Sequence, residues 1–214
     1  MKNGFFLFVA IILGLSGCST MYYETMEKVG VHKRDIMIDR VKEARDTQDD
    51  AKKQFLTAME QFKSVVNFKG GNLEKEYNKL NDTLQDSESK ASAVRNRISA
   101  VEDVSDALFR EWRSEIKQYS SDTLRKSSQR KYDITQQKYK QLIGSMKKAE
   151  ARLEPVLVPL RDQVLFLKHN LNAQAIGGLQ DELGSVQTNV DSLVRDMNRA
   201  IAEADEFIAA LQVE

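Results

Sequence analysis

Residues 179–211, LQDELGSVQTNVDSLVRDMNRAIAEADEFIAAL, decide the fold. Within them an apolar residue recurs at every third or fourth position without exception. That spacing gives an α-helix one continuous apolar stripe, which needs other helices to cover it. We call such a stripe a seam, and this one consists of Leu179, Leu183, Val186, Val190, Leu193, Met197, Ala200, Ala204, Phe207 and Leu211.

Three earlier stretches carry the same spacing, over residues 37–65, 73–119 and 132–170. Charged residues make up 30% of the chain and only two residues are proline, a composition that favours long helices. The sequence therefore predicts an all-α protein, an elongated antiparallel bundle or stack of coiled-coil hairpins of about four long helices. A single helical domain should occupy residues 34–214.

Short interruptions separate the seams. Residues 68–72 contain a glycine pair suited to ending a helix, and Asn72 suits the N-cap of the next one. Residues 119–122 contain neither glycine nor proline, so a turn with Ser121 as N-cap competes with one continuous helix. The glycines at 177–178 are predicted to end the third helical stretch.

Two prolines, Pro155 and Pro159, lie inside the third seam. A proline within a helix removes a backbone donor, and its ring collides with the preceding turn. We therefore expect the third helix to be kinked at these prolines, between Glu154 and Leu160, or to break into two helices.

The N-terminus has the pattern of an export signal. Lys2 precedes an apolar run over residues 5–13, which is too short to span a bilayer. Ser16 and Gly17 then precede Cys18, the only cysteine of the chain. This order resembles the lipobox of bacterial lipoproteins. The resemblance implies a diacylglyceryl group on the Cys18 thiol, signal cleavage between Gly17 and Cys18, and acylation of the new N-terminus. The alternative is an ordinary secretory signal with a chance cysteine.

A lipobox has consequences for the mature chain. Residues 1–17 would be removed as the signal peptide, and residues 18–33 would form a lipidated tether. Two or more acyl chains hold a protein stably on a membrane. By analogy with lipoproteins, Ser19 in place of an aspartate favours the periplasmic face of the outer membrane of a Gram-negative bacterium. The covalent lipid on Cys18 is the one prosthetic group expected, with no other cofactor.

Charge is balanced overall but uneven along the chain. The formal net charge is zero, which argues against a nucleic-acid partner. Residues 110–152 hold 12 basic and 5 acidic side chains, whereas residues 178–214 hold 2 basic and 8 acidic ones. Either these two stretches pack together and neutralise each other, or a basic face meets an anionic envelope surface, such as lipopolysaccharide, phospholipid headgroups or peptidoglycan.

Sequence signatures of enzymes do not occur. His32 and His169 are the only histidines, and neither belongs to a His-Glu-x-x-His or Glu-x-x-His motif. The chain contains no glycine-rich phosphate loop and no Gly-x-Ser-x-Gly elbow. The sequence therefore predicts a protein that is not an enzyme and that holds no metal ion.

The segment 155–176 is the most unusual part of the predicted mature chain, because it is apolar around more of its circumference than the other seams. One interpretation is a surface for a partner or ligand. The other is a well-covered core helix whose polar residues set the register of packing. The candidate surface residues are Asp162, Phe166, Lys168, His169, Asn170 and Asn172.

Residues 155–160, PVLVPL, and 162–176, DQVLFLKHNLNAQAI, are also where a family resemblance becomes specific. With the lipobox, they resemble a family of uncharacterised helical envelope lipoproteins of Gram-negative bacteria, domain-of-unknown-function family 2959. The resemblance covers nearly the whole mature chain and implies no reaction.

These observations favour a lipid-anchored structural or scaffolding protein that binds an envelope protein whose identity the sequence does not reveal. An alternative is an amphiphile-binding or membrane-remodelling module, in which the segment 155–176 opens at its prolines to hold acyl chains. Oligomers are also compatible with the sequence, because seams can be covered between chains as well as within one.

Overall fold

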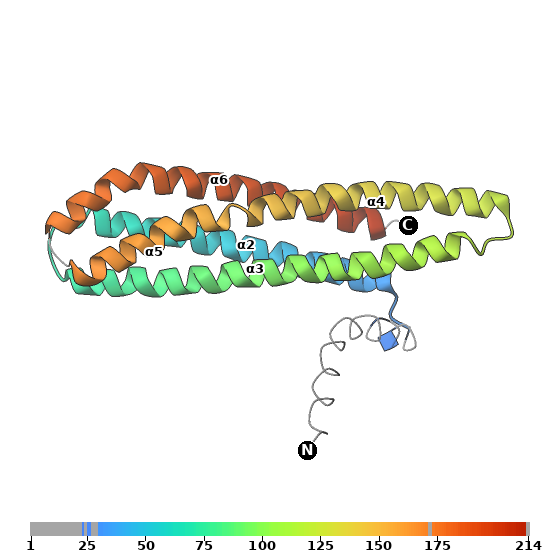
Figure 1. Cartoon of the computed structure of the whole chain (residues 1–214), viewed down its shortest axis with the longest axis horizontal. Coiled ribbons are helices and arrows are strands. Elements are labelled where there is room, and N and C mark those ends of the chain that lie inside the picture. The colour runs from blue at the N-terminus through green and yellow to red at the C-terminus, as the bar shows by residue number, and fades with distance from the viewer. Residues whose placement is uncertain (1–22, 24, 27–29, 171–172, 213–214) are drawn as a thin grey trace, which may run out of the picture.

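The computed structural model describes residues 23, 25–26, 30–170 and 173–212, with side chains of 173–175 excepted. These residues form a long bundle of antiparallel helices (Figure 1), which confirms the predicted all-α class, and no strand occurs among them. The helices are α2 (Lys33–Val66), α3 (Leu73–Ile116), α4 (Asp122–Glu150), α5 (Leu153–His169) and α6 (Ala173–Gln212).

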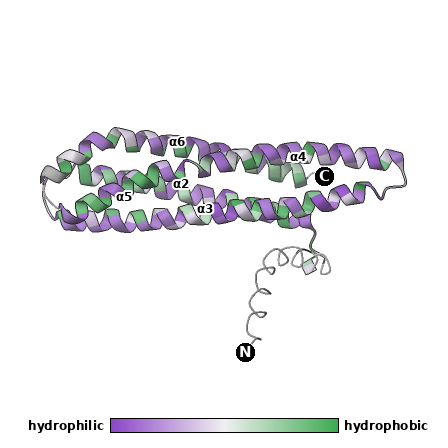
Figure 2. Cartoon of the chain, in the orientation of Figure 1, coloured by the Kyte–Doolittle hydropathy of each residue, from purple (hydrophilic) through white to green (hydrophobic). Residues whose placement is uncertain are grey.

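Four rods make up the bundle, because α4 and α5 follow one another along a single line (Figure 1). α2 packs against α3 and α6, and the α4–α5 rod packs against the same two helices. The order around the bundle is therefore α2, α3, α4–α5 and α6, an up-down-up-down arrangement. Apolar residues recur along each helix between stretches of polar ones (Figure 2).

The predicted seams form the core, except that Tyr119 at the end of the second seam is 40% exposed. Phe55 and Phe62 of the first seam have no exposed surface. All nine positions of this first seam are buried, namely Met37, Val41, Ala44, Gln48, Ala51, Phe55, Ala58, Phe62 and Val65. Nine of the ten positions of the last seam are buried too, and Leu183 is half-buried against the core. The polar member of the first seam, Gln48, is fully buried, and neither of its amide atoms has a hydrogen-bond partner among the described residues.

Two predicted N-caps are confirmed. Asn72 accepts a hydrogen bond on its side chain from the backbone N–H of Lys75 at 3.0 Å, and Ser121 accepts one from the N–H of Leu124 at 3.4 Å. The turn before Ser121 is therefore real, and the alternative of one continuous helix is wrong. α2 ends at Asn67 rather than at the glycine pair; Gly70 and Gly71 lie in the following loop with φ of 136° and 119°.

The third rod breaks at residues 151–152, just before Pro155. In a continuous helix, the ring of Pro155 would collide with the carbonyl of Ala151, four residues earlier. The chain avoids that collision by starting α5 at Leu153, where Pro155 occupies the first turn and needs no backbone partner. Pro159 remains inside α5. The expected break into two helices is thus present, with the interruption slightly before the predicted interval.

The predicted stop at residues 177–178 is wrong. α5 ends at His169, and α6 begins at Ala173 and continues through both glycines. Asn170 caps α5 by donating from its side chain to the carbonyl of Phe166 at 2.9 Å. Glycine disfavours a helix by only about 1 kcal/mol, and the burial of Ile176 and Leu179 offsets that penalty.

Helices α4 and α6 lie side by side, as the charge distribution predicts, but they neutralise each other only near the α4–α5 break. There Asp196 of α6 pairs with Lys148 at 3.0 Å and Arg152 at 3.1 Å. Farther along α6, Asp205 pairs instead with Arg45 of α2 at 2.7 Å. The first half of α4 therefore keeps its positive charge.

Candidate functional site

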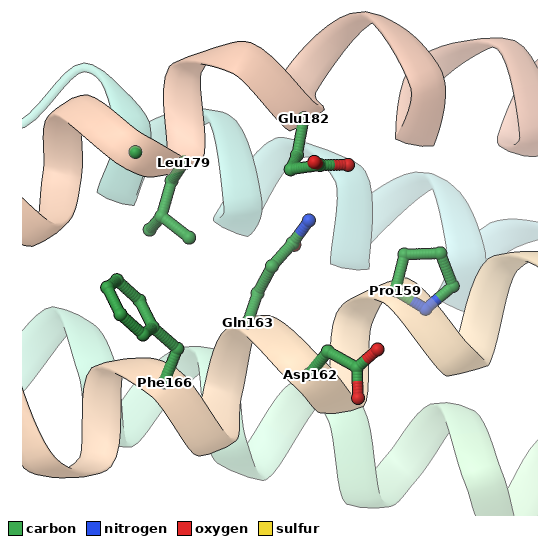
Figure 3. A pocket seen from close by; sticks show the side chains of 7 residues that line it. Pro159, Asp162, Gln163, Phe166, Leu179 and Glu182 are labelled. Atoms are coloured by element: carbon green, nitrogen blue, oxygen red, sulfur yellow. The ribbon is translucent and has the colours of Figure 1, made fainter.

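A cleft of about 410 Å³ lies between α5 and α6. Its residues are spaced three to four apart along each helix, so that one face of each helix turns toward the opening. Figure 3 shows these side chains from close by. The lining residues are Pro159, Asp162, Gln163 and Phe166 of α5 and Gly178, Leu179 and Glu182 of α6.

Gln163 is the central polar group of this cleft. Its side chain extends from α5 toward α6, between Asp162 and Phe166 and below Glu182 (Figure 3). Only 5% of the residue is exposed, and its Oε1 atom has no hydrogen-bond donor among the described residues. A buried acceptor without a donor costs about 1–3 kcal/mol, so the wall of the cleft contains an unsatisfied polar atom at this position.

Two carboxylates flank that position. Asp162 and Glu182 are both exposed, and neither forms an ion pair with another described residue. These two carboxylates give the cleft negative potential. The arrangement favours a group that carries positive charge and N–H donors.

Exposed apolar side chains also lie on α5, the helix that forms one wall of the cleft. Val158, Leu165 and Phe166 are 47%, 61% and 45% exposed, although α5 is only 17 residues long. Single exposed apolar residues are common, whereas three large ones on one short helix beside a cleft are typical of a binding surface. Phe166 belongs to both the cleft and the exposed surface.

The opposite side of α5 is held to α3 by ion pairs. Arg161 donates to Glu88 of α3 and, at 3.0 Å, to Glu154 of its own helix, while Arg95 of α3 also pairs with Glu154 at 2.7 Å. The hydrogen bonds to Glu88 and Glu154 raise the pKa of Arg161, and the hydrogen bond from Arg161 lowers the pKa of Glu154. This network fixes α5 from behind and leaves its cleft face open.

The structure brings together only some of the predicted surface residues. Asp162 and Phe166 line the cleft, whereas Lys168 and His169 are exposed at the end of α5 outside it. Asn170 caps that helix, as described above, and is half-buried. His169 and Asn170 therefore do not set register in the core, and that interpretation is wrong for them. The remaining predicted residues, Gly17, Cys18 and Asn172, lie outside the described residues.

Sequence reasoning missed half of the cleft. Gln163 falls within the predicted seam over residues 132–170 but was not among the candidate surface residues, and no pattern singled out Glu182. A signal exists for Gln163, since a polar residue in an apolar seam requires a partner. Glu182 has no such signal, because its position opposite α5 depends on where the chain reverses between Asn170 and Ala173.

A second cleft, of about 510 Å³, lies on another side of the first turns of α6. It is bordered by the α2–α3 loop and by Ile176, Gly177 and Gln180. The beginning of α6 therefore has open space on two sides. Neither glycine at 177–178 has a neighbouring atom within 4 Å of where a Cβ would lie.

The described residues contain no group of three or more His, Cys, Asp or Glu side chains placed to hold a metal ion. None of their helices combines the length and apolar character that crossing a lipid bilayer requires.

Comparison with known proteins gives one family. A family model described as "Protein of unknown function (DUF2959)" matches residues 22–211. No curated protein matches the chain.

Proposed function

The chain belongs to the DUF2959 family, and we propose that it is a non-enzymatic scaffolding lipoprotein that binds a partner protein in the α5–α6 cleft. One observation carries the proposal: the carboxylates of Asp162 and Glu182, which form no ion pair with another described residue, line a cleft beside the exposed ring of Phe166. A bound segment would pair its cations with these carboxylates and cover the apolar ring.

The lining defines the chemistry of the partner. A lysine or arginine side chain suits the carboxylates of Asp162 and Glu182. An apolar side chain suits Phe166 and Leu165, which would otherwise stay in water. We therefore infer a partner segment with basic and apolar residues next to each other.

Lipidation at Cys18 gives this cleft a defined position. α2 begins at Lys33 at one end of the bundle, and the cleft lies toward the other end (Figure 1). The 34 residues of α2 span about 50 Å. A lipid on Cys18 would attach the near end to the outer membrane from its periplasmic face, and the rod would present the cleft away from the lipid.

Site-specific crosslinking in intact cells tests the cleft. A photo-activated residue at position 166 should capture one defined protein, whereas the same residue at Leu56 should capture none. Leu56 is a matched control, because it is 41% exposed and lines no cleft described above. Capture of the same protein at both positions, or at neither, would contradict the proposed site.

The polar groups need a separate test. Asp162→Asn combined with Glu182→Gln should reduce capture at position 166, because it removes the charge that attracts a basic segment. Asp39→Asn combined with Glu60→Gln removes two charges from exposed positions of α2 and should leave capture unchanged.

The anchor is tested independently of the cleft. Cys18→Ser should abolish incorporation of labelled palmitate and leave the signal peptide attached. Labelled fatty acid on the Cys18→Ser protein would show that the lipobox interpretation is wrong, whatever the crosslinking result.

A second candidate function is amphiphile binding by the segment 155–176. The open space on both sides of the first turns of α6 and the exposed apolar residues of α5 favour it. Native mass spectrometry of the unlipidated protein, purified without detergent, distinguishes the two. Bound lipid that is lost in Phe166→Asp would support this function, and lipid-free protein would exclude it.

A further inference from the structure

The α3–α4 hairpin projects beyond the rest of the bundle. Arg34 near the start of α2 and Leu211 near the end of α6 border the same cleft as Trp112 and Lys131. Past this level α3 and α4 continue alone to their connecting turn (Figure 1). We call residues 110–140 the basic hairpin, since they hold nine basic and four acidic side chains.

Aromatic packing makes this hairpin a firm extension of the bundle. Phe109 and Trp112 of α3 pack edge-on against Tyr132 of α4, with ring centres 5.6 and 5.7 Å apart. The indole N–H of Trp112 donates to Ser128 at 2.9 Å. These contacts occupy the inner faces of the two helices, and the charged residues lie outside them.

The cations of the hairpin are mostly unpaired. Glu111 is paired with Lys33 at 3.0 Å, and Asp122 is paired with Arg125. Eight cations form no ion pair with any other residue in the described part of the chain, namely Arg110, Arg113, Lys117, Lys126, Arg130, Lys131, Lys138 and Lys140.

Apolar side chains are interleaved with these cations. Ile134 is 53% exposed and lies in a stripe of four-residue spacing with Lys126, Arg130 and Lys138, all of them exposed. At the turn, Tyr119 and Leu124 are 40% and 57% exposed. A polysaccharide would match the charge but not the exposed leucine and isoleucine. Cations, a tyrosine and apolar side chains together suit the boundary between lipid headgroups and hydrocarbon.

We propose that the basic hairpin binds the surface of a bilayer that contains anionic phospholipids, with its cations on the headgroups and Leu124 and Ile134 at the acyl boundary. The hairpin lies at the same end of the bundle as the start of α2 (Figure 1). A lipid on Cys18 would bring the hairpin to the membrane, and this one step rests on the proposed function. The rod would then be held at two points rather than one.

Vesicle co-sedimentation tests the hairpin without the anchor. The chain of residues 19–214 contains every described helix and cannot be lipidated. It should bind vesicles of phosphatidylcholine mixed with phosphatidylglycerol, and should not bind phosphatidylcholine alone. Added salt should weaken the binding, because exposed charges are screened.

Charge reversal identifies the surface. Lys126→Glu, Arg130→Glu and Lys138→Glu together should weaken binding by roughly a hundredfold, from about fivefold for each cation lost. The matched control reverses three exposed lysines at the other end of the bundle, Lys63, Lys69 and Lys75, and should bind as the parent chain does. Ile134→Ser should weaken binding without changing charge.

Two outcomes would overturn the proposal: equal loss of binding in both triple variants, or binding to isolated peptidoglycan without binding to vesicles. The assay contains neither an acyl group nor a partner protein. Its failure would leave the cleft and the anchor to be judged by their own experiments.

Discussion

Asn189 of α6 donates a hydrogen bond from Nδ2 to the carbonyl oxygen of Pro155 in α5, at 3.1 Å. In an α-helix that oxygen would accept from the N–H of residue 159, but Pro159 has none. The side chain of a neighbouring helix thus supplies the donor that a proline removed. Seven residues farther along α6, Asp196 pairs with Lys148 in the last turn of α4 and with Arg152 within the α4–α5 break.

Removing this donor should destabilise the bundle only when the proline is present. Asn189→Ala should lower the free energy of unfolding by about 1 kcal/mol, the usual contribution of one hydrogen bond. In a Pro159→Ala background the backbone N–H returns, and the same substitution should cost much less. Urea unfolding of the four proteins measures the coupling. An equal loss in both backgrounds would show that Asn189 acts in another way.

Stability should depend on pH through Asp196. Burial raises the pKa of this carboxyl, but the hydrogen bonds from Lys148 and Arg152 together outweigh burial and hold the pKa below its ordinary value. The folded protein therefore binds a proton less readily than the unfolded chain. This contribution to stability is complete above about pH 4, the unfolded pKa of an aspartate, and is lost as pH falls through the lower folded pKa.

Asp196→Asn should accordingly lower the free energy of unfolding at neutral pH by about 1–2 kcal/mol. The difference from the parent protein should shrink as the solution is made more acidic. Asp205→Asn is the control, since its pair with Arg45 is exposed and should contribute little at any pH. If the difference in free energy of unfolding between Asp196→Asn and the parent protein stayed constant as the pH fell, the lowered pKa of Asp196 would not be the source of the pH dependence.

Gln48→Leu should stabilise the protein. The side chain of Gln48 is fully buried with both amide atoms unpaired among the described residues, and leucine removes that penalty at similar volume. We expect a gain of about 1–2 kcal/mol in thermal or urea unfolding. Gln54→Leu should show no gain, because Gln54 already donates to the carbonyl of Thr83 at 3.1 Å.

Gln163→Leu extends that comparison to the cleft. It removes another buried atom without a partner, so the free energy of unfolding should rise. Capture of a partner at position 166 should stay unchanged, because the enclosed Oε1 atom cannot reach a bound segment. A variant that is less stable, or that loses capture, would show that Gln163 contributes more than an unsatisfied buried atom.

A substitution at Gly177 tests whether α6 continues through the glycines at 177–178, and a substitution at Gly71, in the α2–α3 loop, is its contrast. Gly177 lies within the helix with open space around it, so Gly177→Ala should stabilise by about 0.5–1 kcal/mol. Gly71 has a φ of 119°, which an alanine rarely adopts, so Gly71→Ala should destabilise. Thermal unfolding measures both. Destabilisation by Gly177→Ala would mean that residues 177–178 form a turn after all.

The rods were predictable because each seam repeats many times. A pattern that places Phe55, Phe62 and Phe207 in one core leaves little freedom, and the N-caps at Asn72 and Ser121 follow from side-chain chemistry. The end of α5 was not predictable in the same way. Asn170 and the glycines at 177–178 are both plausible stops, and the packing of Ile176 and Leu179 decides between them.

The candidate site likewise has residues that the sequence pattern could identify and residues that depend on packing. Asp162 and Phe166 could be identified because they stand out within one unusual segment. Glu182 and the hairpin surface depend on which helices are neighbours and on how far α3 and α4 project beyond α6. The spacing of residues within one helix reveals neither which helices are its neighbours nor how far it projects.

α6 contacts both α2 and the α4–α5 rod, so that two of the four interfaces around the bundle need the last 40-residue helix. A chain that emerges from its N-terminus can pair α2 with α3 early and add α4 and α5, but it cannot close the ring. Until α6 arrives, the apolar seams on either side of it remain open to water. Chains that end before α6 would expose those seams. Proteases and chaperones that recognise exposed apolar surface can therefore distinguish truncated chains from complete ones.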